Sequence, residues 1–203
     1  MKRKFTFTMA LAILLSFGLK AQYSVVYRFL GDENGYSPTG SLISDGTYLY
    51  GITPYGGLHY DQYNKPAGTV FKIRFSDNVY TKMHDFNDIN GGTPLYTLNA
   101  EGEYLYGVTA SGGTTNNGTI FGVNKTNNTF SKLLDFNGTN GKTPTGALIS
   151  DGTNLYGVAQ LGGIDGFGSV FKFNIQTRKL TTMHHFNGSD GAHPLGGLYS
   201  DGV

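Results

Sequence analysis

The chain has 203 residues, with 15 Lys and Arg against 14 Asp and Glu, so its formal net charge is only +1. Three of the basic residues lie at positions 2–4, which leaves no basic stripe to follow a phosphate backbone and argues against nucleic-acid binding. Cysteine is absent, which excludes disulfides, thiol catalysis, cysteine zinc sites and a lipoprotein cysteine. Gly at 31 residues and aromatic side chains at 14% are typical of short strands joined by tight turns.

Residues 1–21 have the pattern of a secretory signal peptide. Lys2, Arg3 and Lys4 form a positive segment, and an apolar stretch follows from Phe5 to Leu19. Ala21 offers a small residue for cleavage; a buried helix is the alternative interpretation. The pattern predicts a protein that is secreted or displayed on the outer cell surface. No later segment is long and apolar enough to predict a transmembrane helix in the mature chain.

The rest of the chain, residues 22–203, repeats with a period of about fifty residues. Four prolines recur with spacings of 56, 50 and 50 residues: Pro38, Pro94, Pro144 and Pro194. Three Tyr-Gly pairs follow the same spacing, and each precedes a double glycine: Tyr50-Gly51, Tyr106-Gly107 and Tyr156-Gly157. Fixed periods of this length indicate a solenoid, a propeller or an array of repeats.

Each period is expected to hold four short strands. In the third copy these are Gly146–Ser150, Asn154–Ala159, Ser169–Asn174 and a strand from about Lys179 to His185. Asp151-Gly152 predicts a hairpin turn between the first two strands. Four strands per fifty residues predict an all-β fold, a β-propeller of four-stranded blades. The predicted units are residues 29–85, 86–135 and 136–185, with a truncated unit at 186–203; the double glycines are similar to those of kelch blades, and a right-handed β-solenoid is the alternative.

Three stretches of the repeat occur in a specific order. They are Leu155-Tyr156-Gly157 with Gly162-Gly163, then Gly168–Lys172, then the run from His185 to Pro194. They resemble the GloVer tandem repeat of exported bacterial proteins with varying surface anchors. The resemblance implies an extracytoplasmic β-repeat protein and brings no catalytic residues. The first copy departs from the pattern at Phe29-Leu30-Gly31-Asp32 and in an insertion after Gly57.

The strand count predicts an incomplete ring. Gln22–Arg28 aligns with a fourth strand, and a lone first strand is expected near Gly196–Ser200. With the three full units these give fourteen strands, whereas a ring of four blades needs sixteen. We therefore expect a partial ring that is a fragment of a longer protein, with missing C-terminal blades or an anchor. The N-terminal strand would close the ring by the exchange common in propellers.

Histidines and loop carboxamides are expected to serve the scaffold. His84 and His184 share a repeat position with Leu134, which indicates packing rather than metal binding. The loop after each fourth strand is rich in oxygen ligands, such as Asp85, Asn87 and Asn90. Their spacing is one residue out of register with a calcium loop, so turns are favoured and calcium is the alternative. No metal site and no cofactor are predicted.

The clearest departure from the repeat is the insertion at residues 58–66. Its rings and polar groups are the side chains of sugar and protein recognition surfaces, although a loop without a ligand is the alternative. The predicted binding residues are His59, Tyr60, Asp61, Tyr63 and Asn64.

The predicted function is a non-enzymatic binding or adhesion module for an extracellular glycan or protein. The axis-facing positions are expected to be small or apolar, and no nucleophile elbow is present in the sequence. The alternative is a polysaccharide hydrolase or lyase with its active site on the propeller axis.

Overall fold

The computed structural model describes residues 24–31, 33–59 and 67–201. These residues form three four-stranded antiparallel sheets, and none of them lies in a helix. Within the described part of the chain, no helix is long and apolar enough to cross a membrane. The signal segment predicted at residues 1–21 lies outside the described residues.

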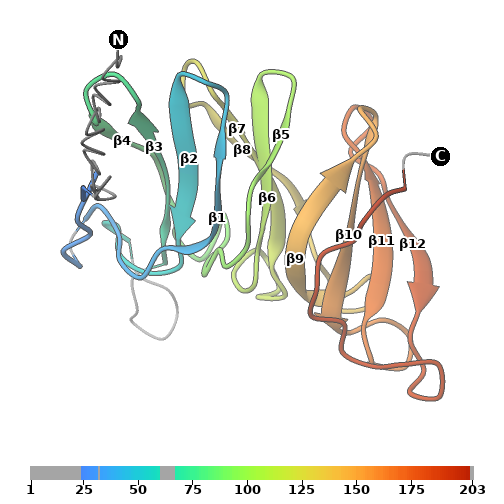
Figure 1. The fold of residues 1–203 in the computed structure, drawn as a ribbon. Helices are drawn as coiled ribbons and strands as arrows, with labels where there is room; N and C mark the ends of the chain where they lie inside the picture. Colours follow the sequence, from blue (N-terminus) through green and yellow to red (C-terminus); the bar gives the residue numbers. More distant parts are fainter. Residues whose placement is uncertain (1–23, 32, 60–66, 202–203) are drawn as a thin grey trace, which may run out of the picture.

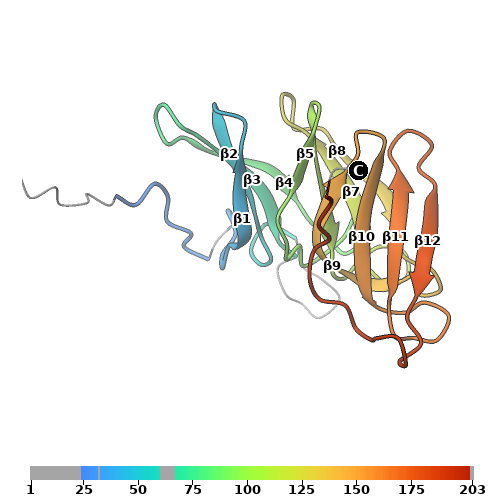
Figure 2. The same ribbon diagram turned by 45° about the vertical axis from the view of Figure 1, so that its right-hand side comes forward.

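Each sheet is a meander whose strand order follows the chain. The first sheet contains β1 (Thr39–Ser44), β2 (Tyr48–Thr53), β3 (Thr69–Arg74) and β4 (Tyr80–Asp85). The second contains β5 (Asn99–Glu101), β6 (Tyr104–Thr109), β7 (Thr119–Asn124) and β8 (Phe130–Asp135). The third contains β9 (Lys142–Ser150), β10 (Asn154–Leu161), β11 (Ser169–Asn174) and β12 (Leu180–His185). The sheets stand side by side in chain order (Figures 1 and 2).

The three sheets share one hydrogen-bonding register, which confirms the fifty-residue repeat. Each third strand pairs with its fourth strand through a shift at the same repeat position, between Val70 and Phe71, Ile120 and Phe121, and Val170 and Phe171. A bulge of this kind increases the local twist. The all-β fold and the propeller blades predicted from the sequence are therefore confirmed.

Two predicted strands of the third copy are longer than expected, and two other predicted strands are absent from the described residues. β9 begins at Lys142 rather than Gly146, and β10 runs to Leu161 rather than Ala159. The segments predicted at Gln22–Arg28 and Gly196–Ser200 hold no strand in their described residues. Neither segment pairs with another strand in the described residues, and a strand forms only within a hydrogen-bonded ladder.

Neighbouring sheets are joined by a phenylalanine that follows each fourth strand. Phe86 packs on Phe121 of the second sheet, with ring centroids 5.0 Å apart, and Phe136 packs on Phe171 of the third sheet at 5.2 Å. Both Phe86 and Phe136 are fully buried. Phe29 makes the same contact with Phe71 of the first sheet at 5.0 Å. The segment before β1 thus takes the place of a preceding blade, as its alignment with a fourth strand predicts, but it does so through side chains.

The glycine of each Tyr-Gly pair is explained by a close approach of an aromatic ring. A Cβ added to Gly51, Gly107 or Gly157 would lie 2.5–2.6 Å from the Cζ atom of the phenylalanine on the adjacent third strand. None of these glycines has a positive φ, so ring packing rather than backbone conformation requires glycine there.

We expect Gly107→Ala to lower the free energy of unfolding by about 1–3 kcal/mol, because overpacking forces the Phe121 ring or the strand to shift. Urea denaturation would measure the change. Gly196→Ala is the control, since a Cβ added there meets nothing within 4 Å. Equal stability of Gly107→Ala and the wild type would show that the ring yields freely.

Candidate functional site

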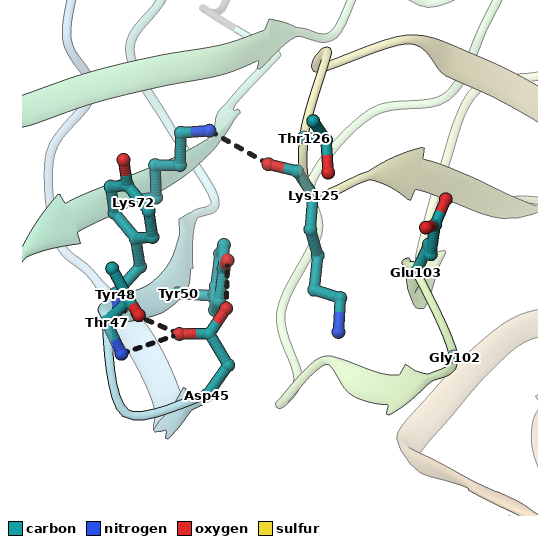
Figure 3. Close-up of a pocket in the computed structure, with 9 residues that line it drawn as sticks. All are labelled: Asp45, Thr47, Tyr48, Tyr50, Lys72, Gly102, Glu103, Lys125 and Thr126. Atoms are coloured by element: carbon teal, nitrogen blue, oxygen red, sulfur yellow. Dashed lines mark hydrogen bonds between the residues drawn. The ribbon is translucent and has the colours of Figure 1, made fainter.

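A polar groove lies between the first and second sheets, at the end where the β1–β2 turn is found (Figure 3). Its volume is about 410 Å³. The first sheet supplies the β1–β2 turn and a β3 side chain, and the second sheet supplies its β5–β6 and β7–β8 turns. The lining residues are Asp45, Thr47, Tyr48, Tyr50, Lys72, Gly102, Glu103, Lys125 and Thr126.

Asp45 is held by hydrogen bonds on both of its carboxylate oxygens. Oδ1 accepts the main-chain N–H groups of Thr47 and Tyr48 at 2.9 and 2.8 Å, which forms the turn that Asp45-Gly46 predicts. Oδ2 accepts the Tyr50 hydroxyl at 2.7 Å. Burial alone would raise the pKa of Asp45, but these hydrogen bonds keep it below its ordinary value. Asp45 is therefore an ionised anchor for the turn and for Tyr50.

Tyr50 is 2% exposed and forms one wall of the groove. Burial, followed by the hydrogen bond to Asp45, raises the pKa of its hydroxyl above the ordinary value. Tyr50 therefore stays neutral and keeps donating to Asp45 at physiological pH.

Lys72 brings a positive charge to the inner part of the groove. The residue is 8% exposed, and its ammonium donates one hydrogen bond of 2.9 Å to the main-chain carbonyl of Lys125. The ammonium also lies 4.9 Å from the centroid of the Tyr48 ring, a cation–π contact. Burial lowers the pKa of Lys72, and the charge of Asp45 offsets part of that effect.

No carboxylate of the described residues lies within ion-pair distance of the Lys72 ammonium. An ammonium has three donors, so two remain for a ligand in the groove. Glu103 and Lys125 line the groove on the side of the second sheet (Figure 3). The groove thus carries two charges of each sign beside two tyrosine rings.

The three copies of the repeat differ at the position of the groove lysine. The third copy has the same residues as the first, Asp151, Tyr156 and Lys172, and its Tyr156 hydroxyl donates to Asp151 at 2.7 Å. The second copy has Glu101, Tyr106 and Gly122 instead. There the Tyr106 ring lies over Gly122, where an added Cβ would be 3.2 Å from Tyr106 Cε1. The lysine groove is therefore not a general property of the blade.

Of the residues predicted as the binding site, only His59 is described, and it lies beyond the other end of β2. Tyr48 begins β2 and lines the groove, whereas His59 follows the end of β2 and lines a different cavity with Lys82, His84 and Asp85. A six-residue strand spans about 17 Å, so His59 is remote from the groove. Tyr60, Asp61, Tyr63 and Asn64 lie outside the described residues, and their binding role stays a prediction.

The polar loops after the fourth strands are turns built on reciprocal hydrogen bonds. Asn87 and Asn90 each accept the main-chain N–H of the other through Oδ1, at 2.9 and 3.0 Å. Asn137 and Asn140 repeat the pair at 3.0 Å. These amide oxygens are thus acceptors within their own loops, as the turn interpretation predicts.

The histidines have packing and turn roles. His84 stacks on Phe130 with centroids 3.6 Å apart, which confirms the packing role inferred from Leu134. His184 Nε2 lies 3.0 Å from Asp190 Oδ2. His185 Nδ1 faces the N–H of Ile164 at 3.3 Å, as Asp85 Oδ1 faces the N–H of Leu58. The position tolerates either residue because both offer an acceptor there.

Comparison with known proteins identifies the repeat. A sequence model described as the Gloeobacter/Verrucomicrobia repeat matches residues 67–202. A search of curated proteins gave no match.

Solved structures with a similar fold include a chain of a nidogen/laminin complex, with a TM-score of 0.56 and 17% identity over 87% of this chain and 55% of that one. A prolyl endopeptidase structure is similar with a TM-score of 0.51 and 14% identity over 80% of this chain and 21% of that one. The chain thus spans about half the length of the first and a smaller share of the second. At these identities the similarity shows the fold alone.

Proposed function

Because the chain belongs to the Gloeobacter/Verrucomicrobia repeat family and its first two blades enclose a polar groove, we propose that it is a non-enzymatic, extracytoplasmic binding module for a glycan. The groove is the proposed binding site. The observation that carries the proposal is the ammonium of Lys72. The residue is only 8% exposed, and two of its three N–H donors have no partner among the described residues.

The chemistry of the groove suits a polyhydroxylated ligand. Sugar hydroxyls accept from ammonium donors and donate to carboxylates, and Lys72, Lys125 and Glu103 offer both kinds of partner. The partly exposed ring of Tyr48 provides flat apolar surface against which a sugar ring packs. The groove is open and moderately sized, so it can hold a short segment of a longer chain.

The hydrogen bonding of Asp45 supports binding rather than catalysis. A general acid or base must present a free proton site to the substrate. Both oxygens of Asp45 already accept hydrogen bonds from its own turn and from Tyr50, and these bonds depress its pKa. Asp45 is therefore poorly suited to give or take a proton during glycoside cleavage. The extracytoplasmic location rests on the signal-like pattern of residues 1–21.

We expect Lys72→Met to weaken glycan binding by about tenfold or more, because a hydrogen bond to a charged group contributes roughly 1.5–3 kcal/mol. The substitution keeps the length of the side chain and removes the ammonium. A glycan array identifies ligands of the wild-type protein, and calorimetry compares the variants. Lys179→Met is the matched control, since Lys179 is exposed and remote from the groove.

Equal glycan affinity of Lys72→Met and the wild type would contradict the assignment of the groove as the binding site. Turnover of any bound polysaccharide would contradict the non-enzymatic part. The protein for these assays is recovered from the medium or outer surface of producing cells, and its retention in the cytosol would contradict the location.

A further inference from the structure

The third sheet has an exposed apolar face. The equivalent faces of the first two sheets are buried. Met183 is 57% exposed, whereas Met83, at the same repeat position, is 6% exposed. Phe186 is only half-buried, although Phe86 and Phe136 are fully buried. We call this surface the open face. It consists of Tyr156, Val170, Met183, His184 and Phe186.

The connector that follows β12 takes the path of the connectors between blades. The N–H of Phe186 donates to Gly168 at 3.0 Å, as Phe86 and Phe136 donate to Gly68 and Gly118 at 2.9 and 3.0 Å. The N–H of His193 donates to Phe167 at 2.8 Å, as Thr93 and Thr143 donate to Ala67 and Asn117 at 2.9 Å. His193, Thr93 and Thr143 also share positive φ angles of 51–54°. This connector is thus folded as an inter-blade connector.

The same path places the chain beside β9 where a new first strand belongs. A Cβ on Gly146 would lie 2.6–2.7 Å from main-chain atoms of Gly196 and Gly197. A Cβ on Gly40 would meet main-chain atoms of Tyr96 and Thr97, just before β5, at 2.8–3.1 Å. Glycine at both positions allows two neighbouring first strands to approach closely.

We propose that the open face is the docking surface for a further four-stranded unit of the same repeat, carried by the same polypeptide and entered through residues 196–201. The existing blades define what the unit must present. His84 stacks on Phe130 of β8, and Phe86 packs on Phe121 of β7. The docking unit therefore offers an aromatic ring from its third strand, and a ring or large apolar side chain from the start of its fourth.

A second copy of this chain fits the open face less well. The first sheet of such a copy would offer Phe71 and Tyr80 in the required positions. Those rings are already covered, because Phe29 packs on Phe71 at 5.0 Å and Tyr27 stacks on Tyr80 at 4.2 Å. Phe186 and His184 of another copy would have to displace both contacts.

Docking also completes a second groove. Asp151, Tyr156 and Lys172 repeat the arrangement of Asp45, Tyr50 and Lys72, but no following sheet of the described residues closes over them. A further unit would bring its own hairpin turns beside Lys172. The second groove would give the assembled protein two binding sites. That conclusion rests on the proposed function, whereas the docking of the further unit does not.

Methionine oxidation tests the docking without any substitution. The mature region contains two methionines, Met83 and Met183, so Met83 is an internal control for a buried site. The native product, isolated from producing cells, is treated with peroxide, and mass spectrometry follows the two sulfoxides. We expect Met183 to be oxidised as slowly as Met83, in a polypeptide of greater mass than residues 22–203. In residues 22–203 expressed alone, Met183 is expected to be oxidised many times faster than Met83.

Rapid oxidation of Met183 in the native product would overturn the proposal, because the open face would then be solvent-exposed. Protection of Met183 in a dimer whose subunits have the mass of residues 22–203 would also overturn it, in favour of a second copy. Glycan binding is not measured, so failure of the proposed function leaves this outcome unchanged.

Discussion

Phe86→Ala is expected to lower the free energy of unfolding by about 3–5 kcal/mol, the range for a buried Phe in a well-packed core. The ring is fully buried and packs edge-on against Phe121 and Phe130, so its removal leaves a cavity between the first two blades. Urea denaturation followed by far-ultraviolet circular dichroism measures the effect. Because the ring joins two sheets, the loss should also separate the unfolding of the first blade from that of the other two.

The repeat supplies a matched control in Phe186. Phe186→Ala removes the same ring from the same repeat position, but there it is only half-buried and no following sheet covers it in the described residues. In residues 22–203 we expect less than half the cost of Phe86→Ala. Equal costs for the two variants would contradict the inter-blade role of Phe86.

Acidification is expected to destabilise the protein through His84. Burial lowers the pKa of His84 to about 4, and Asn90 and Asp85 offset only part of that effect. An unfolded chain binds the proton at the ordinary value of about 6.5, so it binds more protons than the folded chain between pH 6.5 and 4. The free energy of unfolding that depends on neutral, buried His84 is therefore fully present above pH 6.5. It is lost as the pH falls from 6.5 to 4. The loss approaches about 3 kcal/mol, at 1.36 kcal/mol for each unit of pKa difference.

His84→Leu is the control for this pH dependence, because Leu134 occupies the same position in the second copy. The variant should fold, and its stability should vary less between pH 6.5 and 4 than that of the wild type. Denaturation midpoints measured across that range give the comparison. An identical pH profile for the two proteins would show that His84 is not buried in its neutral form.

The repeat made most of the fold predictable from one sequence. Equivalent residues such as Tyr50, Tyr106 and Tyr156 placed the strands, because residues that recur in every copy serve the blade. The two strand predictions that were wrong concern segments whose structure depends on pairing with a neighbouring strand. The segments near Arg28 and Gly196 have strand-like patterns, yet a strand forms only where a neighbour completes its ladder.

The groove was missed because it belongs to two blades at once. Lys72 comes from β3, and its hydrogen-bond partner is a carbonyl in a turn 53 residues away. Nothing in the sequence places these groups together before the stacking of the sheets is known. One signal was nevertheless present, namely Lys72 and Lys172 at a position where the second copy has Gly122. The insertion at residues 58–66 is a stronger departure from the repeat in the sequence than this single lysine, and His59, its described part, follows the opposite end of β2.

The affinity of the Lys72→Met protein for a glycan that binds the wild type is the most direct test of the groove as the functional site. We predict a loss of about tenfold or more, as one or more charge-assisted hydrogen bonds disappear. The Lys179→Met control should bind as the wild type does. Unchanged affinity of Lys72→Met, in a protein whose circular dichroism and denaturation midpoint are also unchanged, would contradict the assignment.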